Sequence, residues 1–300
     1  MTQTACSARA NERIVMKNHP CFSEAAHRTT GRVHLPVAPE CNLQCGYCVR
    51  KYDCVNESRP GVASIVLSPH EAVDRLQAVV ERTGGIAAVG IAGPGDPLAN
   101  EETFETLDLV RRIYPEAITC VSTNGLALPD RVADLVAVGV RSLTVTINAV
   151  MPETAEEVYA WVSGPDGERM RGRDAAEHLL DRQWAGLRRA AEAGLVVKVN
   201  SVLIPGVNDF ELPAVASIAA DAGARLGNIL PLIPQARFRD VTPPSPADIH
   251  AMRTVCEEHL SQMSHCQQCR ADACGLIGSD RDMETETLIA RLAEDYCEAV

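Results

Sequence analysis

The chain has 300 residues, of which 46% are apolar, and a formal net charge of −12 at pH 7. The negative charge argues against nucleic acid or an anionic membrane surface as a partner. No apolar stretch of membrane-spanning length and no apolar segment near the N-terminus are found, so we expect a soluble, cytoplasmic protein. Twelve cysteines in such a chain predict metal ligands in a reducing compartment rather than disulfides.

Strands and helices are predicted to alternate along most of the chain. Residues 1–18 are polar and show no apolar period, so we expect a loose N-terminal extension. The predicted strands span residues 32–38, 86–90, 117–122, 142–147, 195–203 and 226–230. Ser68 and Ser245 each begin a capping sequence with proline next and an acidic residue three positions on, which predicts a helix start.

One further helix is predicted to start near residue 100, and others are predicted near residues 129–137, 174–193, 210–222, 245–260 and 284–299. Residues 148–173 form a longer and less regular connection, which predicts a lid or an insertion. Strands that alternate with helices indicate an α/β fold with a parallel sheet, and the chain length favours a TIM-type (β/α) barrel, partial or complete.

Three cysteines lie within eight residues directly after the first predicted strand, at positions 41, 45 and 48. Soft thiolate ligands select zinc, copper(I) or iron–sulfur clusters. Three thiolates leave one iron of a four-iron cluster without a protein ligand. The alternative is a zinc knuckle with Cys54 as fourth ligand, but zinc sites usually contain paired Cys-x2-Cys units.

Several further polar positions follow the ends of neighbouring predicted strands. In a parallel barrel the site lies at the carboxyl ends of the strands, where the loops meet. The cysteine loop, the turn Gly93-Pro94-Gly95 and Cys120 are therefore expected to converge. The two glycines would let the backbone approach a ligand closely, although such a run by itself more often marks a plain turn.

The triplet spacing, with Tyr47 before the last cysteine, resembles the signature of the radical S-adenosylmethionine (SAM) superfamily. A wider set of motifs resembles one of its members, the NifB family. These motifs are His19-Pro20-Cys21, His34, residues 50–54 with 56–61, residues 92–97 and residues 265–273. The resemblance covers residues 19 to about 278. Gly93-Pro94-Gly95-Asp96 stands where radical SAM enzymes at large carry Gly-Gly-Glu-Pro.

The resemblance implies an enzyme that begins assembly of the nitrogenase iron–molybdenum cofactor. Two four-iron substrate clusters would be fused around a carbide taken from the methyl group of SAM, with one additional sulfur. The implied product is the [8Fe-9S-C] precursor NifB-co, and the implied by-products are 5′-deoxyadenosine and S-adenosylhomocysteine. The implied cofactors are SAM and three [4Fe-4S] clusters, one catalytic and two that are substrates.

The resemblance also implies roles for individual residues. The cluster that binds SAM would be held by Cys41, Cys45 and Cys48. The first substrate cluster would be held by Cys21, His34 and Cys120, and the second by Cys54, Cys266 and Cys269. The expected SAM contacts are Tyr47, Gly93, Gly95, Asp96, Asn124 and Asn148.

Other residues allow a plainer interpretation. Without the resemblance, His34 would be read as a hydrogen-bonded core histidine. Cys274 follows the Cys266/Cys269 pair and is at most a spare ligand. Ordinary thiols are expected at Cys6, Cys256 and Cys297.

The resemblance implies three regions: an N-terminal extension at 1–30 with a cluster ligand, a barrel at 31–262, and a cluster-binding tail at 263–300. The chain ends at Val300, so we expect the stand-alone form without a NifX-like domain. The implied partners are iron–sulfur cluster donors, a reductant such as ferredoxin or flavodoxin, the scaffold NifEN and carriers of the NifX type. No nucleic acid and no membrane are expected.

Two other functions remain open from the sequence. One is a radical SAM enzyme with an auxiliary cluster that acts on a small organic substrate. The other is a non-enzymatic iron–sulfur scaffold or carrier, which would not need a SAM site.

Overall fold

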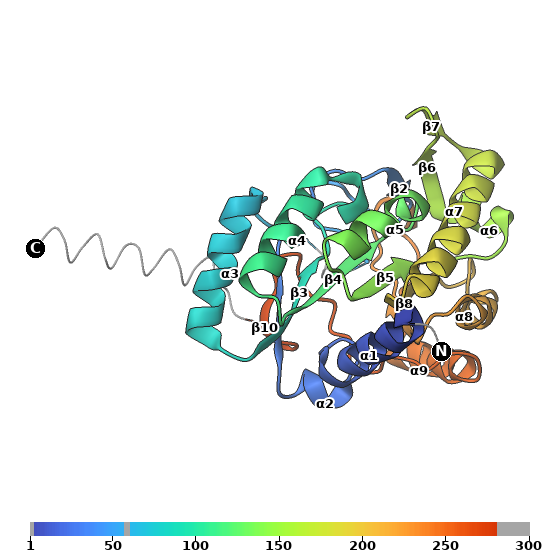
Figure 1. The fold of residues 1–300 in the computed structure, drawn as a ribbon. Helices are drawn as coiled ribbons and strands as arrows, with labels where there is room; N and C mark the ends of the chain where they lie inside the picture. The colour runs from blue at the N-terminus through green and yellow to red at the C-terminus, as the bar shows by residue number, and fades with distance from the viewer. Residues whose placement is uncertain (1–2, 57–60, 281–300) are drawn as a thin grey trace, which may run out of the picture.

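The computed structural model describes residues 3–56 and 61–280, and its centre is one curled sheet (Figure 1). The sheet has eight strands in the order β11-β10-β1-β3-β4-β5-β8-β9, and the run from β1 to β9 is parallel. The parallel strands are β1 (Gly31–His34), β3 (Ile86–Ile91), β4 (Ile118–Thr123), β5 (Ser142–Thr146), β8 (Val196–Leu203) and β9 (Leu226–Pro231). The predicted α/β class is confirmed, as an open half-barrel.

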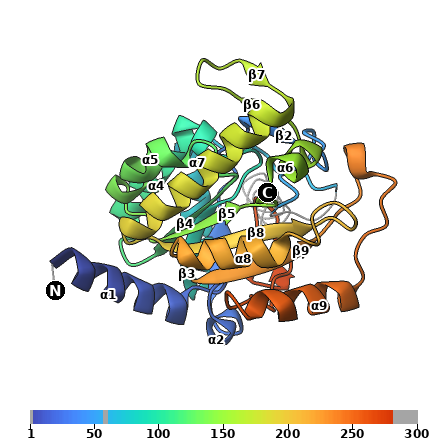
Figure 2. The same cartoon turned by 90° about the vertical axis from the view of Figure 1, so that its right-hand side faces the viewer.

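Helices cover the outer side of the sheet, where α4, α5, α7 and α8 follow one another (Figure 2). The helices are α3 (Pro69–Thr83), α4 (Glu101–Ile113), α5 (Leu128–Ala137), α7 (Gly172–Glu192), α8 (Leu212–Asp221) and α9 (Pro246–Glu257). Two short 3-10 turns are η1 (Pro97–Ala99) and η2 (Ala236–Phe238). None of the described helices is long and apolar enough to cross a membrane.

Both capping sequences form as predicted. The side chain of Ser68 accepts a hydrogen bond from the Glu71 amide, and the Glu71 carboxylate accepts one from the Ser68 amide. Ser245 and Asp248 repeat this arrangement. Helix α9 ends at Glu257, earlier than residue 260. The helix predicted at 284–299 lies outside the described residues.

The N-terminal segment is a helix, α1 (Gln3–Asn18), and not the loose extension that its sequence predicted. It lies across the end of the sheet where the strands begin (Figure 1). Val15 is fully buried there. Val15 belongs to a group of buried apolar side chains that includes Ala88, Ile118, Val196 and Leu226. The Asn11 amide nitrogen donates to the carbonyls of Arg141 and Gly194, both at 2.9 Å. The prediction failed because contacts with distant segments hold the helix, among them buried Val15, the two Asn11 bonds and an ion pair of Glu12 with Arg225 at 2.8 Å. Such contacts leave no apolar stripe in its sequence.

Residues 148–173 are an insertion that supports the cysteine loop. They form α6 (Pro152–Val158), β6 (Tyr159–Ser163) and β7 (Arg169–Met170). Strand β6 pairs antiparallel with β2 (Leu43–Cys45), which is part of the cysteine loop, in a second sheet ordered β2-β6-β7. Cys45 lies opposite Tyr159 in this pairing.

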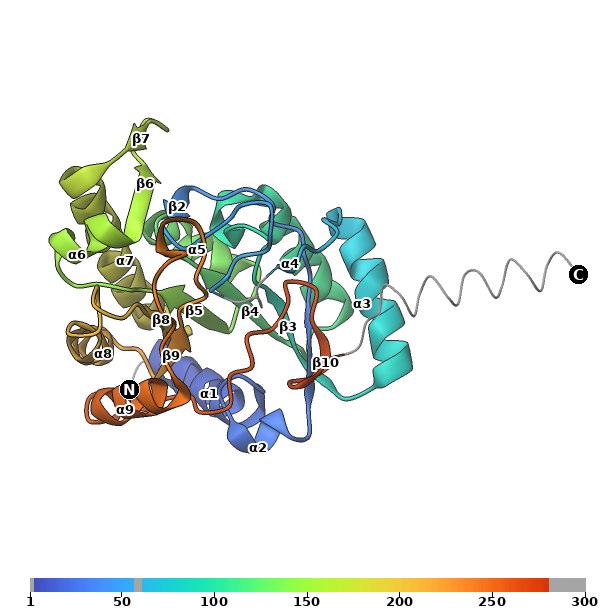
Figure 3. The same ribbon diagram turned by 180° about the vertical axis from the view of Figure 1, so that it is seen from behind.

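The segment after α9 returns across the open side of the sheet to its edge (Figure 3). There β10 (Cys274–Leu276) pairs antiparallel with β1, and the short β11 (Ser279–Asp280) pairs with β10. The His34 amide also donates to the Ala273 carbonyl at 2.8 Å. The tail cysteines are thereby brought to the inner side of the first strand.

Candidate functional site

Two neighbouring cavities open at the inner side of the sheet. The first, which we call the triplet cavity, encloses about 470 Å³ including its mouth and contains all three cysteines of the loop. Cys45 and Cys48 are buried and Cys41 is half-buried. The cavity is also lined by Leu43, Tyr47, Arg50, Cys54, Val55, Asn56, Ala92, Gly95, Asp96, Ser122, Thr123, Asn124 and Thr146.

Two sets of hydrogen bonds hold the cysteine loop in place. On one side the Gly46 amide donates to the Val158 carbonyl at 2.7 Å, next to the β2–β6 pairing. Within the loop, the side-chain nitrogen Nε2 of Gln44 donates to the backbone carbonyls of Cys48 at 2.8 Å and Cys45 at 3.0 Å. These bonds orient the three thiols before any metal is bound.

Gly95 was expected to let the backbone approach a ligand, and the structure shows that it also packs directly against the backbone of Glu40. A Cβ atom at this position would lie 2.1 Å from the Glu40 carbonyl oxygen. The Gly95 amide donates to the Ala38 carbonyl at 2.5 Å, and the Asp96 amide donates to Glu40 at 2.8 Å. The missing side chain lets the loop after β3 lie directly against the backbone that leads into the cysteines.

Asp96 organises the wall opposite the triplet. Its buried carboxylate accepts hydrogen bonds from Thr123 Oγ1 and from the Asn124 amide, the latter at 2.6 Å. Burial raises the pKa of Asp96, although these hydrogen bonds oppose the rise. The Asn124 side chain donates to Asn42 Oδ1 at 2.7 Å and lies 3.8 Å from Cys41 Sγ. Asp96 and Asn124 therefore fix one edge of the cavity.

The expected SAM contacts do not all reach the triplet cavity. Tyr47, Gly95, Asp96 and Asn124 line it. Gly93 and Asn148 are not among its lining residues. Asn148 is fully buried behind Tyr47, where its side-chain nitrogen donates to the hydroxyls of Tyr47 at 2.8 Å and Tyr159 at 3.1 Å.

Burial keeps the triplet thiols protonated when no metal is bound. It raises the pKa of Cys41 to about 11, with a further rise from the Asp96 carboxylate, and that of Cys45 well above its ordinary value. Burial also raises the pKa of Cys48, while the Arg50 guanidinium opposes the rise. Because thiolates and not thiols ligate metal, cluster binding here must release protons.

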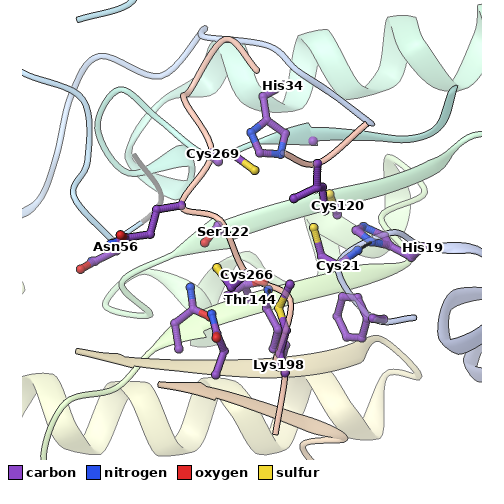
Figure 4. A pocket seen from close by; sticks show the side chains of 18 of the residues that line it. His19, Cys21, His34, Asn56, Cys120, Ser122, Thr144, Lys198, Cys266 and Cys269 are labelled. Carbon is purple, nitrogen blue, oxygen red and sulfur yellow. Dashed lines mark hydrogen bonds between the residues drawn. The ribbon is translucent and has the colours of Figure 1, made fainter. Parts of the chain in front are cut away.

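The second cavity encloses about 600 Å³ including its mouth and holds five of the other expected cluster ligands. These are Cys21, His34, Cys120, Cys266 and Cys269. Figure 4 shows His34, Cys120, Cys21 and His19 along one wall, with Asn56 at the opposite edge. The cavity lies against the polar inner face of β4, β5, β8 and β9, lined by Ser122, Thr144, Lys198, Asn200 and Asn228.

His34 and Cys120 are placed by strand register. His34 pairs with Gly90 across β1 and β3, and Gly90 pairs with Cys120 across β3 and β4. Residues paired in this way lie on the same face of the sheet. A Cβ at Gly90 would lie 2.7 Å from Cys120 Sγ, so the glycine leaves the space between the His34 and Cys120 side chains.

His34 has a defined tautomer. Its Nδ1 lies 3.0 Å from the Arg270 carbonyl oxygen, which can only accept, so Nδ1 carries the proton. The lone pair is then on Nε2, and a lone pair is what a metal ligand uses. The plain interpretation as a hydrogen-bonded histidine and the ligand interpretation are therefore compatible, since each uses a different nitrogen.

Three buried cationic or basic residues of the second cavity region were not assigned roles from the sequence. His19 is buried, and burial, Lys198 and His34 lower its pKa to about 3. Lys198 is buried on β8. Arg32 donates to Cys269 Sγ at 2.9 Å. A lysine inside the apolar run Val196–Leu203 was the one sequence signal that marks such a position.

The proposed second substrate cluster has ligands in both cavities. Cys54 lines the triplet cavity, whereas Cys266 and Cys269 line the second cavity. Asn56, Ala92 and Ser122 line both. Among the described residues, no three or more His, Cys, Asp or Glu side chains are arranged to hold a metal ion.

The other cysteines lie away from the cavities or outside the described side chains. Cys274 is fully buried in β10 opposite Val33, and Cys256 is fully buried in α9. Neither lines a cavity described above. The side chain of Cys6 and the whole of Cys297 lie outside the described part.

Comparison with known proteins places this geometry in a family context. The model of the Radical SAM superfamily matches residues 35–218. "FeMo cofactor biosynthesis protein NifB" of Klebsiella pneumoniae is 48% identical over 279 residues, which are 91% of this chain and 59% of that protein. The protein of the same name from Methanocaldococcus infernus is 43% identical over 88% of this chain and 87% of its own length.

Solved structures agree in fold. SuiB of Streptococcus suis has a TM-score of 0.55 at 15% identity, covering 86% of this chain and 53% of that one. Methylornithine synthase (PylB) has a TM-score of 0.51 at 13% identity, covering 98% and 89%. The chain spans 53 to 66% of the length of three of its curated bacterial relatives.

Proposed function

The chain belongs to the NifB family of the radical SAM superfamily, and from this premise we propose that it fuses two [4Fe-4S] clusters into the carbide-containing precursor of the nitrogenase cofactor. The proposed reaction inserts a carbon from SAM and one additional sulfur, giving the [8Fe-9S-C] species. Superfamily membership implies SAM and a [4Fe-4S] cluster as cofactors. The two further clusters are proposed as substrates.

The residues of the triplet cavity fit a cluster that binds SAM. Three soft thiol ligands face one cavity, and soft thiolates are the ligands that iron–sulfur clusters take. When bound, this cluster and SAM supply one-electron radical chemistry. Cys41, Cys45 and Cys48 would hold the cluster, and Arg50 favours their thiolate forms. Tyr47, Gly95, Asp96 and Asn124 are proposed to position SAM, with Gly93 and Asn148 supporting them from behind.

The two substrate clusters are proposed to lie next to each other, one in the second cavity and one at the boundary between the two cavities. The first would be held by Cys21, His34 and Cys120 in the second cavity. The second would be held by Cys54, Cys266 and Cys269. Because these three line different cavities, we place the second cluster at the boundary that Asn56, Ala92 and Ser122 share. A cluster there would lie between the SAM site and the first substrate cluster.

The observation that carries the proposal is this adjacency. A radical formed at one site must reach its target without crossing solvent, and the two thiol-rich cavities share three wall residues. A protein that only carries clusters would not need the triplet cavity, whose three cysteines have the spacing of a SAM site. An enzyme with one auxiliary cluster and an organic substrate would need an organic pocket, whereas the second cavity is lined by Cys21, His34, Cys120, Cys266 and Cys269. The geometry therefore supports cluster fusion best.

The partners and the compartment of the reaction are proposed from membership of the NifB family. Iron–sulfur cluster donors would load the chain, and ferredoxin or flavodoxin would reduce it. NifEN and carriers of the NifX type would receive the product. The cytoplasm is the compartment that we propose.

One experiment tests the proposal against both alternatives. The protein is loaded anaerobically with iron and sulfide, then treated with SAM and dithionite. We expect 5′-deoxyadenosine and S-adenosylhomocysteine, and we expect the product to activate cofactor-free nitrogenase. Omission of SAM is the matched control.

Each alternative has its own outcome. Bound iron without SAM cleavage would indicate a scaffold or carrier. SAM cleavage with no product that activates nitrogenase, even with all clusters loaded, would indicate an organic substrate.

A further inference from the structure

His19 carries a buried nitrogen that the assignments above do not use. Its side chain is 2% exposed and lines the second cavity beside Cys21 (Figure 4). Within the described part of the chain, His19 Nε2 has no hydrogen-bond partner. Buried polar atoms are almost always hydrogen-bonded, so an isolated one on a cavity wall points to a missing ligand.

The position of the proton on His19 follows from its other nitrogen. The backbone amide of Cys21 donates to His19 Nδ1 at 3.0 Å. A backbone N–H can only donate, so Nδ1 must be unprotonated. The ring is then neutral and its proton is on Nε2. The atom that faces the cavity without a partner is therefore an N–H donor.

The two histidines of the second cavity are opposite tautomers. The Nδ1 atom of His34 donates to the Arg270 carbonyl, which leaves the lone pair on Nε2. Nδ1 of His19 accepts, which leaves the proton on Nε2. A metal ligand needs a lone pair. To ligate iron through Nε2, His19 would have to move its proton to Nδ1, against the donor from Cys21.

We propose that His19 is a positioning residue that donates a hydrogen bond from Nε2 to a sulfur of the iron–sulfur cluster held at Cys21, without ligating iron. This inference rests on the proposed function only in that a cluster occupies the second cavity. Sulfide and thiolate sulfurs are acceptors, and they are the groups that such a cluster would present here. The bond orients the cluster on Cys21 and shifts its reduction potential upward, since donors to cluster sulfurs stabilise the reduced form.

The test compares His19→Phe with His34→Ala, both in a Cys45→Ala background that removes the cluster of the triplet cavity. Phenylalanine keeps a ring of similar size next to Phe22, whose ring centroid lies 5.0 Å from that of His19. The protein is loaded with iron and sulfide and studied without SAM. Iron content, midpoint potential, nitrogen coupling and exchangeable-hydrogen coupling in D2O are measured, the last two by pulsed electron paramagnetic resonance.

For His19→Phe we expect iron content and the directly bound nitrogen signal to be retained. We expect one exchangeable hydrogen near the cluster to be lost and the potential to shift downward. His34→Ala should instead lose the nitrogen signal. His19→Gln, which restores an N–H donor, should recover most of the potential, and it also serves if His19→Phe folds poorly.

Two results would overturn the proposal. Loss of the bound-nitrogen signal in His19→Phe would make His19 a ligand. An unchanged potential together with an unchanged exchangeable coupling would leave it as a packing residue. Neither measurement uses SAM cleavage or nitrogenase activation, so failure of the proposed reaction is read separately. Absence of iron from the second cavity of the parent protein would overturn both.

Discussion

Arg32 Nη2 donates to Cys269 Sγ at 2.9 Å, which joins the first strand to the end of the described chain across 237 positions of sequence. Arg32 is 1% exposed, and its Nη1 also donates to the Gly275 carbonyl at 2.8 Å. Burial raises the pKa of Cys269 to about 12, while Arg32 opposes this rise. The guanidinium therefore does two things: it holds the tail and it favours the thiolate of a proposed ligand.

Replacement of Arg32 should loosen the tail and weaken iron binding. Arg32→Met leaves the Gly275 carbonyl and Cys269 without their donor, so we expect the free energy of unfolding to fall by about 1–3 kcal/mol. Hydrogen exchange should become faster at 266–276, and less iron should remain in the second cavity. Arg75→Met is the control, because Arg75 also anchors the tail, through a hydrogen bond to the Asp272 carbonyl at 3.1 Å. Equal iron loss in both variants would contradict the role of Arg32 at Cys269.

The triplet prediction concerns Cys45. Cys45→Ala leaves two thiolates in the triplet cavity, so we expect its cluster to be lost and SAM cleavage to fall to background. The ligands of the second cavity lie on other segments, so most of the remaining iron should stay bound. Cys256→Ala is the matched control, since that buried thiol lies in α9. Wild-type formation of 5′-deoxyadenosine by Cys45→Ala would show that SAM binds elsewhere.

His34 should supply the bound nitrogen of a substrate cluster. His34→Ala removes the proposed nitrogen ligand of the second cavity, so its nitrogen coupling should disappear from pulsed electron paramagnetic resonance spectra. Strand β1 keeps its backbone pairing with β3 and β10, and the thermal unfolding temperature should change little. His27→Ala is the control, because His27 does not line the cavity. A retained coupling would assign His34 to packing alone.

Gly95 should be intolerant of any side chain. In Gly95→Ala the added Cβ would lie 2.1 Å from the Glu40 carbonyl, which forces the loop away from the cysteines. We expect a loss of about 1–3 kcal/mol in the free energy of unfolding and reduced iron in the triplet cavity. Gly206→Ala is a useful control: its φ is +77° with no atom within 4 Å, so it adds strain without a clash. Normal SAM cleavage by Gly95→Ala would show that this contact does not position the triplet.

Cys256 gives a pH-dependent prediction for the cluster-free, reduced protein. Burial raises the pKa of Cys256 from 9.0 to about 11. Its neutral form is favoured in the folded state, so its contribution to stability is complete below pH 9 and is lost as pH rises toward 11. We expect the stability advantage of wild type over Cys256→Ala to shrink by on the order of 1–3 kcal/mol across this range. Urea unfolding of both proteins from pH 8 to 11 measures it, and a constant difference would contradict the prediction.

Local patterns in the sequence determined much of this protein. The alternation of strands and helices, the capping boxes at Ser68 and Ser245 and the thiol triplet follow from contacts within a few residues, which is why they could be predicted. The arrival of the cysteine loop and Cys120 at the same edge of the sheet also followed, because parallel strands end on the same side.

Contacts between distant segments decided the rest. Helix α1 was missed because contacts with distant segments, among them those of one buried valine and one asparagine, hold it to strands far along the chain. The pairing of Cys45 with Tyr159 and the bond from Arg32 to Cys269 each join segments more than a hundred residues apart. The separation of Cys54 from Cys266 and Cys269 into two cavities has the same origin. Such contacts depend on how the sheet curls and where the tail returns, and no period or spacing within one segment encodes them.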